Sequence, residues 1–298
     1  MKSLDYKTAG PFSTFAARMP ASSRWRISRA AAVAPCDDRK RGKLNMKMHV
    51  LSGGRVRIRK GIYIPEAERS DMIELPVASI LLRHAQGNVL FDTGCHPDVA
   101  EHADARWGGL AKMMTPVMKP GDHVLTGLAS VGLGTDDIDV IVNSHFHPDH
   151  CGCNSFFKKA TVVVHAEELA AAKAQNGVAQ GYLPVEWDQP MPIDAVTTER
   201  DLFGDGRIVL MHLPGHTPGS MGALAALDRT GAVLLASDTV SLRATLDRDV
   251  VPRNTWNGEA LLKSLAEIRK IEAGGAMVIC GHDAAQWETL RKGAHYYD

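Results

Sequence analysis

Three histidines and an aspartate stand within six residues, directly after an apolar run, and this feature constrains the fold most. The six residues are His145-Phe146-His147-Pro148-Asp149-His150, and they follow Ile138–Val142. Potential ligands in α/β folds gather at the carboxyl ends of strands. On an extended segment His145 and His147 point to the same side, and the proline that follows lets Asp149 and His150 turn toward a neighbouring position. The pattern predicts a strand that ends in a metal site.

Further ligand-type residues follow three later apolar runs, each of which predicts a strand. His216 lies in a turn that two prolines and two glycines fix, Leu213-Pro214-Gly215-His216-Thr217-Pro218-Gly219. Asp238 and His282 each stand two residues after the end of a run. Imidazole nitrogens with carboxylate oxygens suit zinc, and they also accept iron, cobalt or manganese. We therefore expect these residues to complete the metal site.

Strand-like and helical segments alternate along the chain from residue 46, which predicts a layered α/β domain. The predicted strands are Val77–Leu82, Asn88–Phe91, Ile138–Val142, Thr161–Val164, Arg207–Met211, Ala232–Ala236 and Ala276–Cys280. The predicted helices are Ala166–Ala174, Gly258–Ile271 and one that begins near Ala284. The first two strands are joined through Gln86-Gly87, which predicts a hairpin. Gly274-Gly275 is expected to end the long helix.

Charge divides the chain at residue 45. The 34 basic residues balance the 34 acidic residues, but residues 1–45 hold ten basic and three acidic residues, a net charge of +7, which leaves −7 on residues 46–298. That acidic balance speaks against nucleic acid as a partner, and no run of about 18 apolar residues predicts a membrane span. Residues 1–45 show no strand or helix period. We expect residues 1–45 to be a disordered basic extension, of the kind that translation from a start codon upstream of the natural one would add. We expect residues 46–298 to form the catalytic domain.

The remaining cysteines, methionines and histidines have ordinary interpretations. Five cysteines, an odd number, in a chain without a signal-peptide pattern favour free thiols in the cytoplasm. Cys151 and Cys153 either bind a soft metal or pack as small apolar side chains, and we favour packing. The methionines near Trp107 either line an acyl-chain pocket or fill the core; they are Met113, Met114 and Met118. Structural roles are expected for His84, His165, His212 and His295.

Taken together, these motifs resemble the metallo-β-lactamase superfamily over roughly residues 48–298. The order is H-x-H-x-D-H, a histidine after Pro-Gly, an aspartate, and a late Gly-His-Asp. Within the superfamily the pattern is most similar to the N-acyl-homoserine lactonases and the related pyridoxolactonases. The supporting segments are Phe91-Asp92-Thr93-Gly94, Ala236-Ser237-Asp238 and the tail from Gly281-His282-Asp283 to Tyr296-Tyr297. The resemblance implies a four-layer αββα sandwich.

The resemblance also implies two metal ions per chain, expected to be Zn²⁺, with iron, cobalt or manganese as alternatives. The ligands it implies are His145, His147 and His216 for the first ion, Asp149, His150 and His282 for the second, and Asp238 as a bridge. Asp92 falls at a position that supports the site from behind the ligands. A pair of cations about 3.5–4 Å apart would turn a bridging water into a hydroxide near neutral pH.

The reaction implied is the opening of a lactone ring by that bridging hydroxide, with Asp149 and Asp238 as catalytic residues. The expected partner is a small lactone or ester, and the chain is expected to be a monomer or homodimer. Asp238 stands where true β-lactamases of this type have a cysteine, which argues against them. Three alternatives stay open: a glyoxalase II-like thioesterase, a mono-iron persulfide dioxygenase, and a metal-binding homologue without activity.

One position departs from the lactonase pattern. Those enzymes usually carry a tyrosine three residues after the bridging aspartate, where it donates a hydrogen bond to the substrate, and this chain has Ser241 there. A hydroxymethyl group reaches less far than a phenol. Either another group, such as Tyr63 or Trp256, occupies that space, or the substrate differs.

Overall fold

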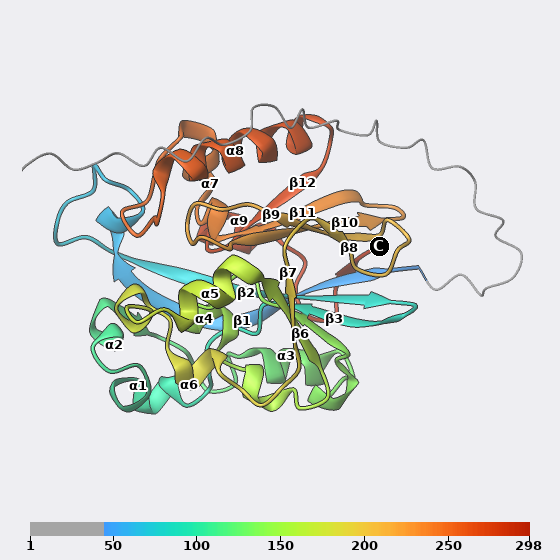
Figure 1. Ribbon diagram of the computed structural model, residues 1–298, viewed down its shortest axis with the longest axis horizontal. Helices are drawn as coiled ribbons and strands as arrows, with labels where there is room; N and C mark the ends of the chain where they lie inside the picture. The colour runs from blue at the N-terminus through green and yellow to red at the C-terminus, as the bar shows by residue number, and fades with distance from the viewer. Residues whose placement is uncertain (1–44) are drawn as a thin grey trace, which may run out of the picture. The chain divides into compact units, whose positions relative to one another are not determined.

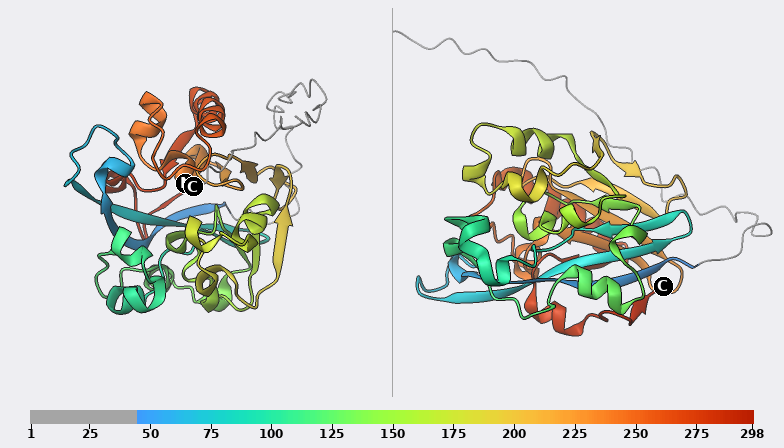
Figure 2. Two further views of the ribbon diagram at one scale, coloured as in Figure 1. Left: turned by 60° about the vertical axis from the view of Figure 1, so that its left-hand side comes forward. Right: turned by 90° about the horizontal axis from the view of Figure 1, so that it is seen from below.

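The computed structural model describes residues 45–298, so the expected basic extension lies outside the described part except for its last residue. Two sheets face each other in this part of the chain (Figures 1 and 2). The first has the order β13-β1-β2-β3-β5-β6-β7, with β4 paired to β1. Its strands are β1 Lys47–Arg59, β2 Met72–His84, β3 Gly87–Phe91, β4 Met114–Pro116, β5 Val140–Val142, β6 Thr161–His165, β7 Ile193–Val196 and β13 Tyr296–Tyr297.

The second sheet has five strands in the order β12-β11-β10-β9-β8. They are β8 Arg200–Asp201, β9 Ile208–His212, β10 Met221–Leu227, β11 Gly231–Ser237 and β12 Met277–Cys280. Helices α7 and α8 cover its outer face in Figure 1, and α3 and α6 lie on the opposite side, beyond the first sheet. The α-helices are α1 Val99–Trp107, α2 Leu110–Met113, α3 Val124–Ser130, α4 Pro148–Cys151, α5 Ala166–Lys173, α6 Pro184–Trp187, α7 Arg243–Arg248, α8 Gly258–Ala273 and α9 Ala284–Thr289.

Apolar side chains fill the space between each pair of layers. Ile80 of β2 and Leu210 of β9 belong to the cluster between the sheets, while Leu81, one residue along, faces the helices behind the first sheet. Successive side chains of a strand point to opposite faces, so a strand covered on both sides is apolar on both. Leu261 and Leu265 of α8 pack on the outer face of the second sheet. This arrangement is the expected αββα sandwich.

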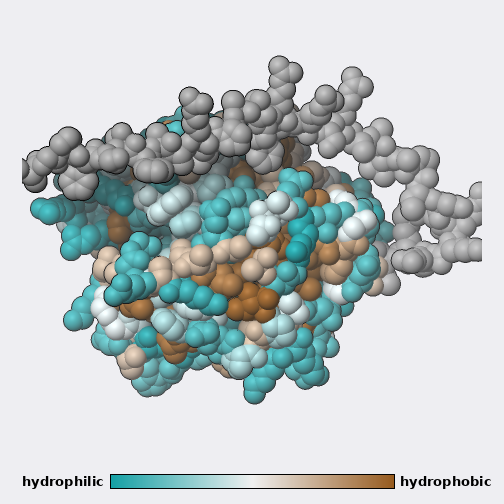
Figure 3. Space-filling model, viewed as in Figure 1, coloured by the Kyte–Doolittle hydropathy of each residue, from teal (hydrophilic) through white to brown (hydrophobic). Residues whose placement is uncertain are grey.

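Most predicted elements are present with shifted ends. The hairpin forms, with His84 paired to Gly87, and α8 ends before Gly274. The predicted strand Ile138–Val142 is shorter, because a one-turn 3-10 helix over Thr135–Asp137 precedes it. No helix within residues 45–298 is long and apolar enough to cross a bilayer. The face shown in Figure 3 is largely hydrophilic, with apolar patches between polar side chains.

The two sheets bring their strand ends to one place. Strands β3, β5 and β6 run parallel, as do β11 and β12. Parallel strands present their carboxyl ends at the same edge of a sheet. The chain after each of these strands therefore reaches a common edge, where the predicted ligands stand.

Candidate metal centre

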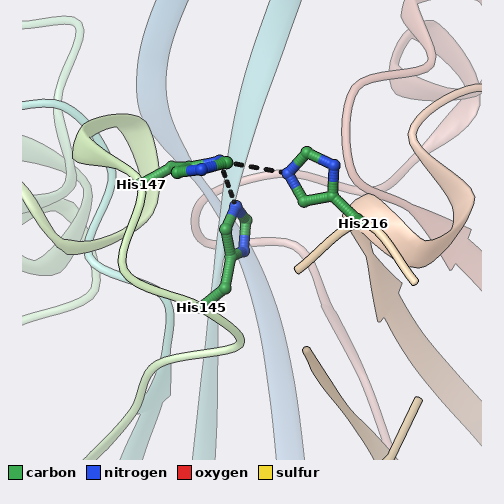
Figure 4. Close-up of side chains that lie close together, drawn as sticks. All are labelled: His145, His147 and His216. Carbon is green, nitrogen blue, oxygen red and sulfur yellow. Dashed lines mark hydrogen bonds between the residues drawn. The ribbon is translucent and has the colours of Figure 1, made fainter. Parts of the chain in front are cut away.

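The first group of histidines joins one segment from each sheet. His145 and His147 follow β5, and His216 follows β9. Nε2 of His145 lies 3.1 Å from Nδ1 of His147, and Nε2 of His216 lies 3.0 Å from the same Nδ1. Figure 4 shows the three rings turned toward one another. These three residues form a cluster whose ligand atoms a single cation can reach.

The second group lies beside the first and comes from α4 and the end of β12. Asp149 and His150 are buried in the single turn of α4, which Pro148 begins. His282 follows β12, and its Nε2 lies 3.6 Å from Oδ2 of Asp149, as does Nε2 of His150. Asp149, His150 and His282 form another cluster of potential ligands.

Asp238 stands between the two groups. Its Oδ1 lies 2.9 Å from Nε2 of His282 and 3.4 Å from Nε2 of His150, whereas its Oδ2 lies 3.6 Å from Nε2 of His216. Each carboxylate oxygen thus faces a different group. Gly281 permits this position, because a Cβ there would lie only 2.5 Å from Oδ1 of Asp238.

The donor atoms that face this centre are suited to metal ions, and several of them lack a hydrogen-bond partner. Nε2 of His150, Nε2 of His282 and Oδ1 of Asp238 face the centre, are buried and make no hydrogen bond of acceptable geometry, although buried polar atoms are normally satisfied. Burial lowers the pKa of His145 well below its usual range and that of His216 to about 3. Neutral imidazoles keep a free lone pair for a cation. His150 and His282 differ, because the neighbouring carboxylates outweigh burial and raise the pKa of both, so a cation would displace a proton there. The donor set as a whole fits metal ions.

A layer of hydrogen bonds holds these ligands from behind. Oδ2 of Asp92 accepts from Nδ1 of His150 at 2.8 Å, and its Oδ1 accepts from the backbone N–H of Ser144 at 2.7 Å. Nδ1 of His282 donates to the carbonyl oxygen of Pro76 at 2.9 Å. Such partners fix which ring nitrogen faces the centre. Asp92 has a φ of 58°, a conformation that only strong local contacts maintain in a residue other than glycine.

Glu168 is a site residue that sequence reasoning missed. The side chain is fully buried, and its Oε1 accepts from the backbone N–H of Phe146 at 3.0 Å, between the first two histidines. Oε2 accepts from the backbone N–H of Gly219 at 3.1 Å, in the loop of His216. Glu168 therefore ties together the two loops that carry the first histidine group. Within the predicted helix it looked like any helical glutamate, and no local pattern distinguishes it.

Ser241 does not face the centre. It is fully buried, and its Oγ donates to the carbonyl oxygen of Asp238 at 3.1 Å. The hydroxyl of Thr239 likewise donates to the carbonyl oxygen of Leu213, at 2.9 Å. Both hydroxyls that follow the central aspartate are thus committed to the backbone.

Most of the side chains given ordinary interpretations pack against neighbours. Cys151 and Cys153 are buried free thiols, and no cysteine of residues 45–298 belongs to a cluster of potential metal ligands. Met114 and Met118 pack around Trp107, whereas Met113 is exposed. Among the histidines expected to be structural, His165 and His212 stack with their ring centroids 3.7 Å apart. Together with Glu167 they form a separate cluster of potential metal ligands.

A four-layer sandwich with histidines and aspartates at its strand ends is the arrangement of the metallo-β-lactamase superfamily. The sequence model of that superfamily matches residues 72–282, so the chain belongs to it. The chain is 29% identical to the N-acyl homoserine lactonase AttM of Azorhizobium caulinodans, over 85% of this chain and 99% of that protein. It is 26% identical to the N-acyl homoserine lactonase AiiB of Agrobacterium fabrum, over 83% of this chain and 96% of that protein.

Solved structures share the fold. An N-acyl homoserine lactone hydrolase, with the product N-hexanoyl-L-homoserine at its catalytic metal center, matches with a TM-score of 0.76 at 23% identity, over 85% of this chain and 99% of its own. AidC, a dizinc quorum-quenching lactonase, matches with a TM-score of 0.64 at 17% identity, over 87% and 96% of the two chains. The predicted superfamily and fold are confirmed.

Proposed function

We propose that this protein is a metal-dependent hydrolase that opens the ring of an N-acyl homoserine lactone or a closely related lactone, and thereby acts as a quorum-quenching lactonase. The observation that carries the proposal is the position of Asp238, whose two oxygens face two separate groups of buried ligands. The relatives matched over almost their whole length, which are N-acyl homoserine lactonases, support the substrate class.

Two Zn²⁺ ions per chain are the proposed cofactors, with iron, cobalt or manganese as alternatives that the same donors accept. The proposed ligands are His145, His147 and His216 for one ion, Asp149, His150 and His282 for the other, and Asp238 for both. When bound, such ions supply a water acidic enough to ionise near neutral pH, and they polarise the ester carbonyl.

The residues of the chain guide the proton of the reaction. In ring opening, the oxygen of water bonds to the lactone carbonyl carbon and gives up a proton, the ring C–O bond breaks, and the leaving oxygen takes up that proton. Asp149 is proposed to carry that proton, because its carboxylate lies at the buried centre beside His150 and His282. Asp92 and Glu168 hold the ligand loops in place during the step.

The proposed compartment is the cytoplasm. Four cysteines are buried free thiols in the described part of the chain, namely Cys95, Cys151, Cys153 and Cys280. Unpaired thiols are typical of a reducing compartment.

The test joins a metal count to a substrate panel. Elemental analysis of the purified protein is expected to give two transition-metal ions per chain, and acyl-homoserine lactones are expected to be opened faster than thioesters. One iron per chain, with oxygen consumed on a persulfide, would overturn the hydrolase. Activity confined to thioesters would replace the lactone by a thioester as the substrate.

A further inference from the structure

The two ring nitrogens of His147 have different partners. Nδ1 faces His145 and His216, whose Nε2 atoms lie 3.1 Å and 3.0 Å away (Figure 4). Nε2 lies 3.1 Å from the carbonyl oxygen of Gln180. A carbonyl oxygen can only accept a hydrogen bond, so Nε2 carries the ring proton and Nδ1 keeps a lone pair for a cation. Gln180 thus selects the tautomer of His147 that can bind metal on the side of the centre.

A tight turn sets the direction of that carbonyl group. Gln180 ends the 3-10 helix Val178–Gln180, and Gly181 follows it with a φ of 96° and a ψ of 0°. The backbone N–H of Gly181 donates to the carbonyl oxygen of Val178 at 3.1 Å and closes the turn. Glycine adopts this left-handed conformation without steric cost, so the turn holds the carbonyl of Gln180 in one direction without strain.

Gly181 also lies against the ring of His147. A Cβ at this position would stand 3.1 Å from Cδ2 and 3.2 Å from Nε2 of that ring. Both distances are shorter than the usual 3.5–4.0 Å of a favourable contact, so a side chain here would displace the imidazole. The next residue, Tyr182, is buried, and its ring centroid lies 5.4 Å from that of His147. The turn 180–182 therefore fixes both the proton and the place of the His147 ring.

The segment that follows this turn is anchored in the interior. The side chain of Glu186, in α6, is fully buried. Its Oε1 accepts from Nε of Arg106 and from Nε1 of Trp107, and its Oε2 accepts from Nη2 of Arg106, each at 2.8 Å. Trp187 stacks on Phe146 with the ring centroids 5.6 Å apart. Breaking a buried, paired charge is costly, so this segment holds a fixed place beside the loop that carries the first two histidines.

We propose, on the basis of the metal centre in the proposed function, that the turn 180–182 positions the ion held by the first histidine group. The carbonyl oxygen of Gln180 keeps the lone pair of His147 on the side of the centre, and the lack of a side chain at Gly181 gives the ring room to face it. Gln180 and Gly181 are positioning residues, because they act through His147. They stand more than 30 positions after it in the chain.

Gly181→Ala tests the contact with the ring. The added methyl group is expected to lower the affinity for one of the two ions by about 10–100-fold, the loss typical of a partner that orients a metal ligand, while the other ion is retained. Zn²⁺ titration against a chromophoric chelator measures the affinity, and elemental analysis after dialysis should give one ion per chain. The visible absorption of the Co²⁺-loaded variant should also differ from that of the wild type.

Gly275→Ala is the matched control. Gly275 follows α8 with a φ of 98°, close to the φ of Gly181, and a Cβ there would have no atom from elsewhere in residues 45–298 within 4 Å. Alanine is disfavoured in this conformation at either position, so both variants should lose a similar amount of thermal stability when metal-free. Metal affinity should fall in Gly181→Ala alone. Equal affinities in the two variants would overturn the role of Gly181.

Gly181→Asn separates the contact from backbone strain. Asparagine tolerates a left-handed conformation better than alanine does, so this variant should fold even where the alanine variant does not. Its Cβ would meet the ring of His147 at the same distances. We therefore expect metal affinity to fall as in Gly181→Ala. Wild-type affinity in Gly181→Asn would assign the loss to strain and contradict a role through His147.

The tautomer of His147 can be observed without metal or substrate. In long-range ¹H–¹⁵N NMR spectra of the metal-free protein, the neutral ring of His147 should carry its proton on Nε2. A proton on Nδ1 would overturn the role of Gln180.

Failure of this inference differs from failure of the proposed function. A wild type that binds two ions and opens no lactone would end the lactonase proposal and leave the positioning role intact. A wild type that binds no metal would overturn the metal centre, and the positioning role with it. Two bound ions, with the same affinities in Gly181→Ala and Gly275→Ala, would overturn the positioning role alone.

Discussion

Asp238 is the side chain of the centre whose two oxygens face both groups of proposed ligands. Its two oxygens face histidines from different groups, and Gly281 leaves room for it. No side chain of one group alone can therefore take over the contacts that Asp238 makes to both groups. Removing it would take one proposed ligand oxygen away from each group, which should weaken the binding of both ions.

Asp238→Ala is expected to lower kcat/KM by more than about 10³, comparable to the loss of a central catalytic group, and to reduce the bound metal. Cys153→Ala is the contrasting variant, because Cys153 is buried, its Sγ donates to the carbonyl oxygen of Cys95, and it belongs to no cluster of potential metal ligands among residues 45–298. It should cost about 1 kcal/mol of stability and little activity. Steady-state kinetics with elemental analysis provide the measurement. Equal losses of activity and metal in the two variants would show that the Cys151–Cys153 pair binds metal.

Glu168 offers a test of ligand positioning without touching a ligand. Glu168→Gln keeps the shape but has one acceptor oxygen, so one of the N–H groups of Phe146 and Gly219 loses its partner. We expect metal affinity to fall by about 10–100-fold, as for other supporting partners of metal ligands, in a chelator competition assay. Glu101→Gln, at an exposed position of α1 that belongs to no cluster of potential ligands in the described part of the chain, is the control. Wild-type affinity in the first variant would contradict the positioning role.

Among the elements, those with a clear local pattern were predictable. Strands rich in Val and Ile, such as β6, and the amphipathic α8 lie where their periodicity indicates. Strand β10 was not predicted, because its Gly and Ala residues show no alternation and its register comes from pairing with β9 and β11. The seven proposed ligands could be selected from the sequence because each belongs to a segment that follows an apolar run, and the structure places them in adjoining clusters. Glu168 was not recognised as a site residue, since only tertiary contacts bring it to the ligand loops.

The start of α8 provides a test at the scale of a single element. The side chain of Asn257 accepts from the backbone N–H of Ala260 at 3.0 Å and caps the helix. Asn257→Ala is expected to lower the free energy of unfolding by about 1 kcal/mol, the usual value of an N-cap, in urea denaturation. Asn257→Asp restores a capping oxygen and should be close to the wild type. An unchanged midpoint in the alanine variant would show that the cap adds no stability.

At the scale of the whole molecule, the centre joins the two sheets. His145 and His147 follow a strand of the first sheet, whereas His216, Asp238 and His282 follow strands of the second. Ions bound by both sets would link the sheets in the folded state only. Metal binding should therefore add to global stability.

Chelation of the metal is expected to lower the melting temperature by about 5–10 °C. Ligand at 100 times its Kd contributes about 2.7 kcal/mol, and each kcal/mol shifts the melting temperature of a chain of this size by about 2–4 °C. Differential scanning calorimetry before chelation, after it and after return of Zn²⁺ measures the change. A melting temperature indifferent to the metal would contradict a link between the sheets.

We also expect a chain that begins at Met46 to fold and turn over substrate like the full chain. Residues 45–298 belong to one compact unit, and Met46 and Met48 are already buried in the cluster between its sheets. Circular dichroism, metal content and kcat/KM of the two chains provide the comparison. A shorter chain that fails to fold or to hold metal would show that the basic segment belongs to the catalytic domain.

Because Asp238 lies between histidines that follow strands of both sheets, the geometry of the centre depends on how the two sheets are aligned. A slide of one sheet against the other changes the surroundings of both groups together, and a misplacement of about 1 Å can cost catalysis about 100-fold. Side chains that pack between the sheets, such as Ile80 and Leu210, fix that alignment. Core residues without any chemistry of their own should therefore influence the reaction rate. We expect small changes of their volume to lower kcat at a point where the protein still folds.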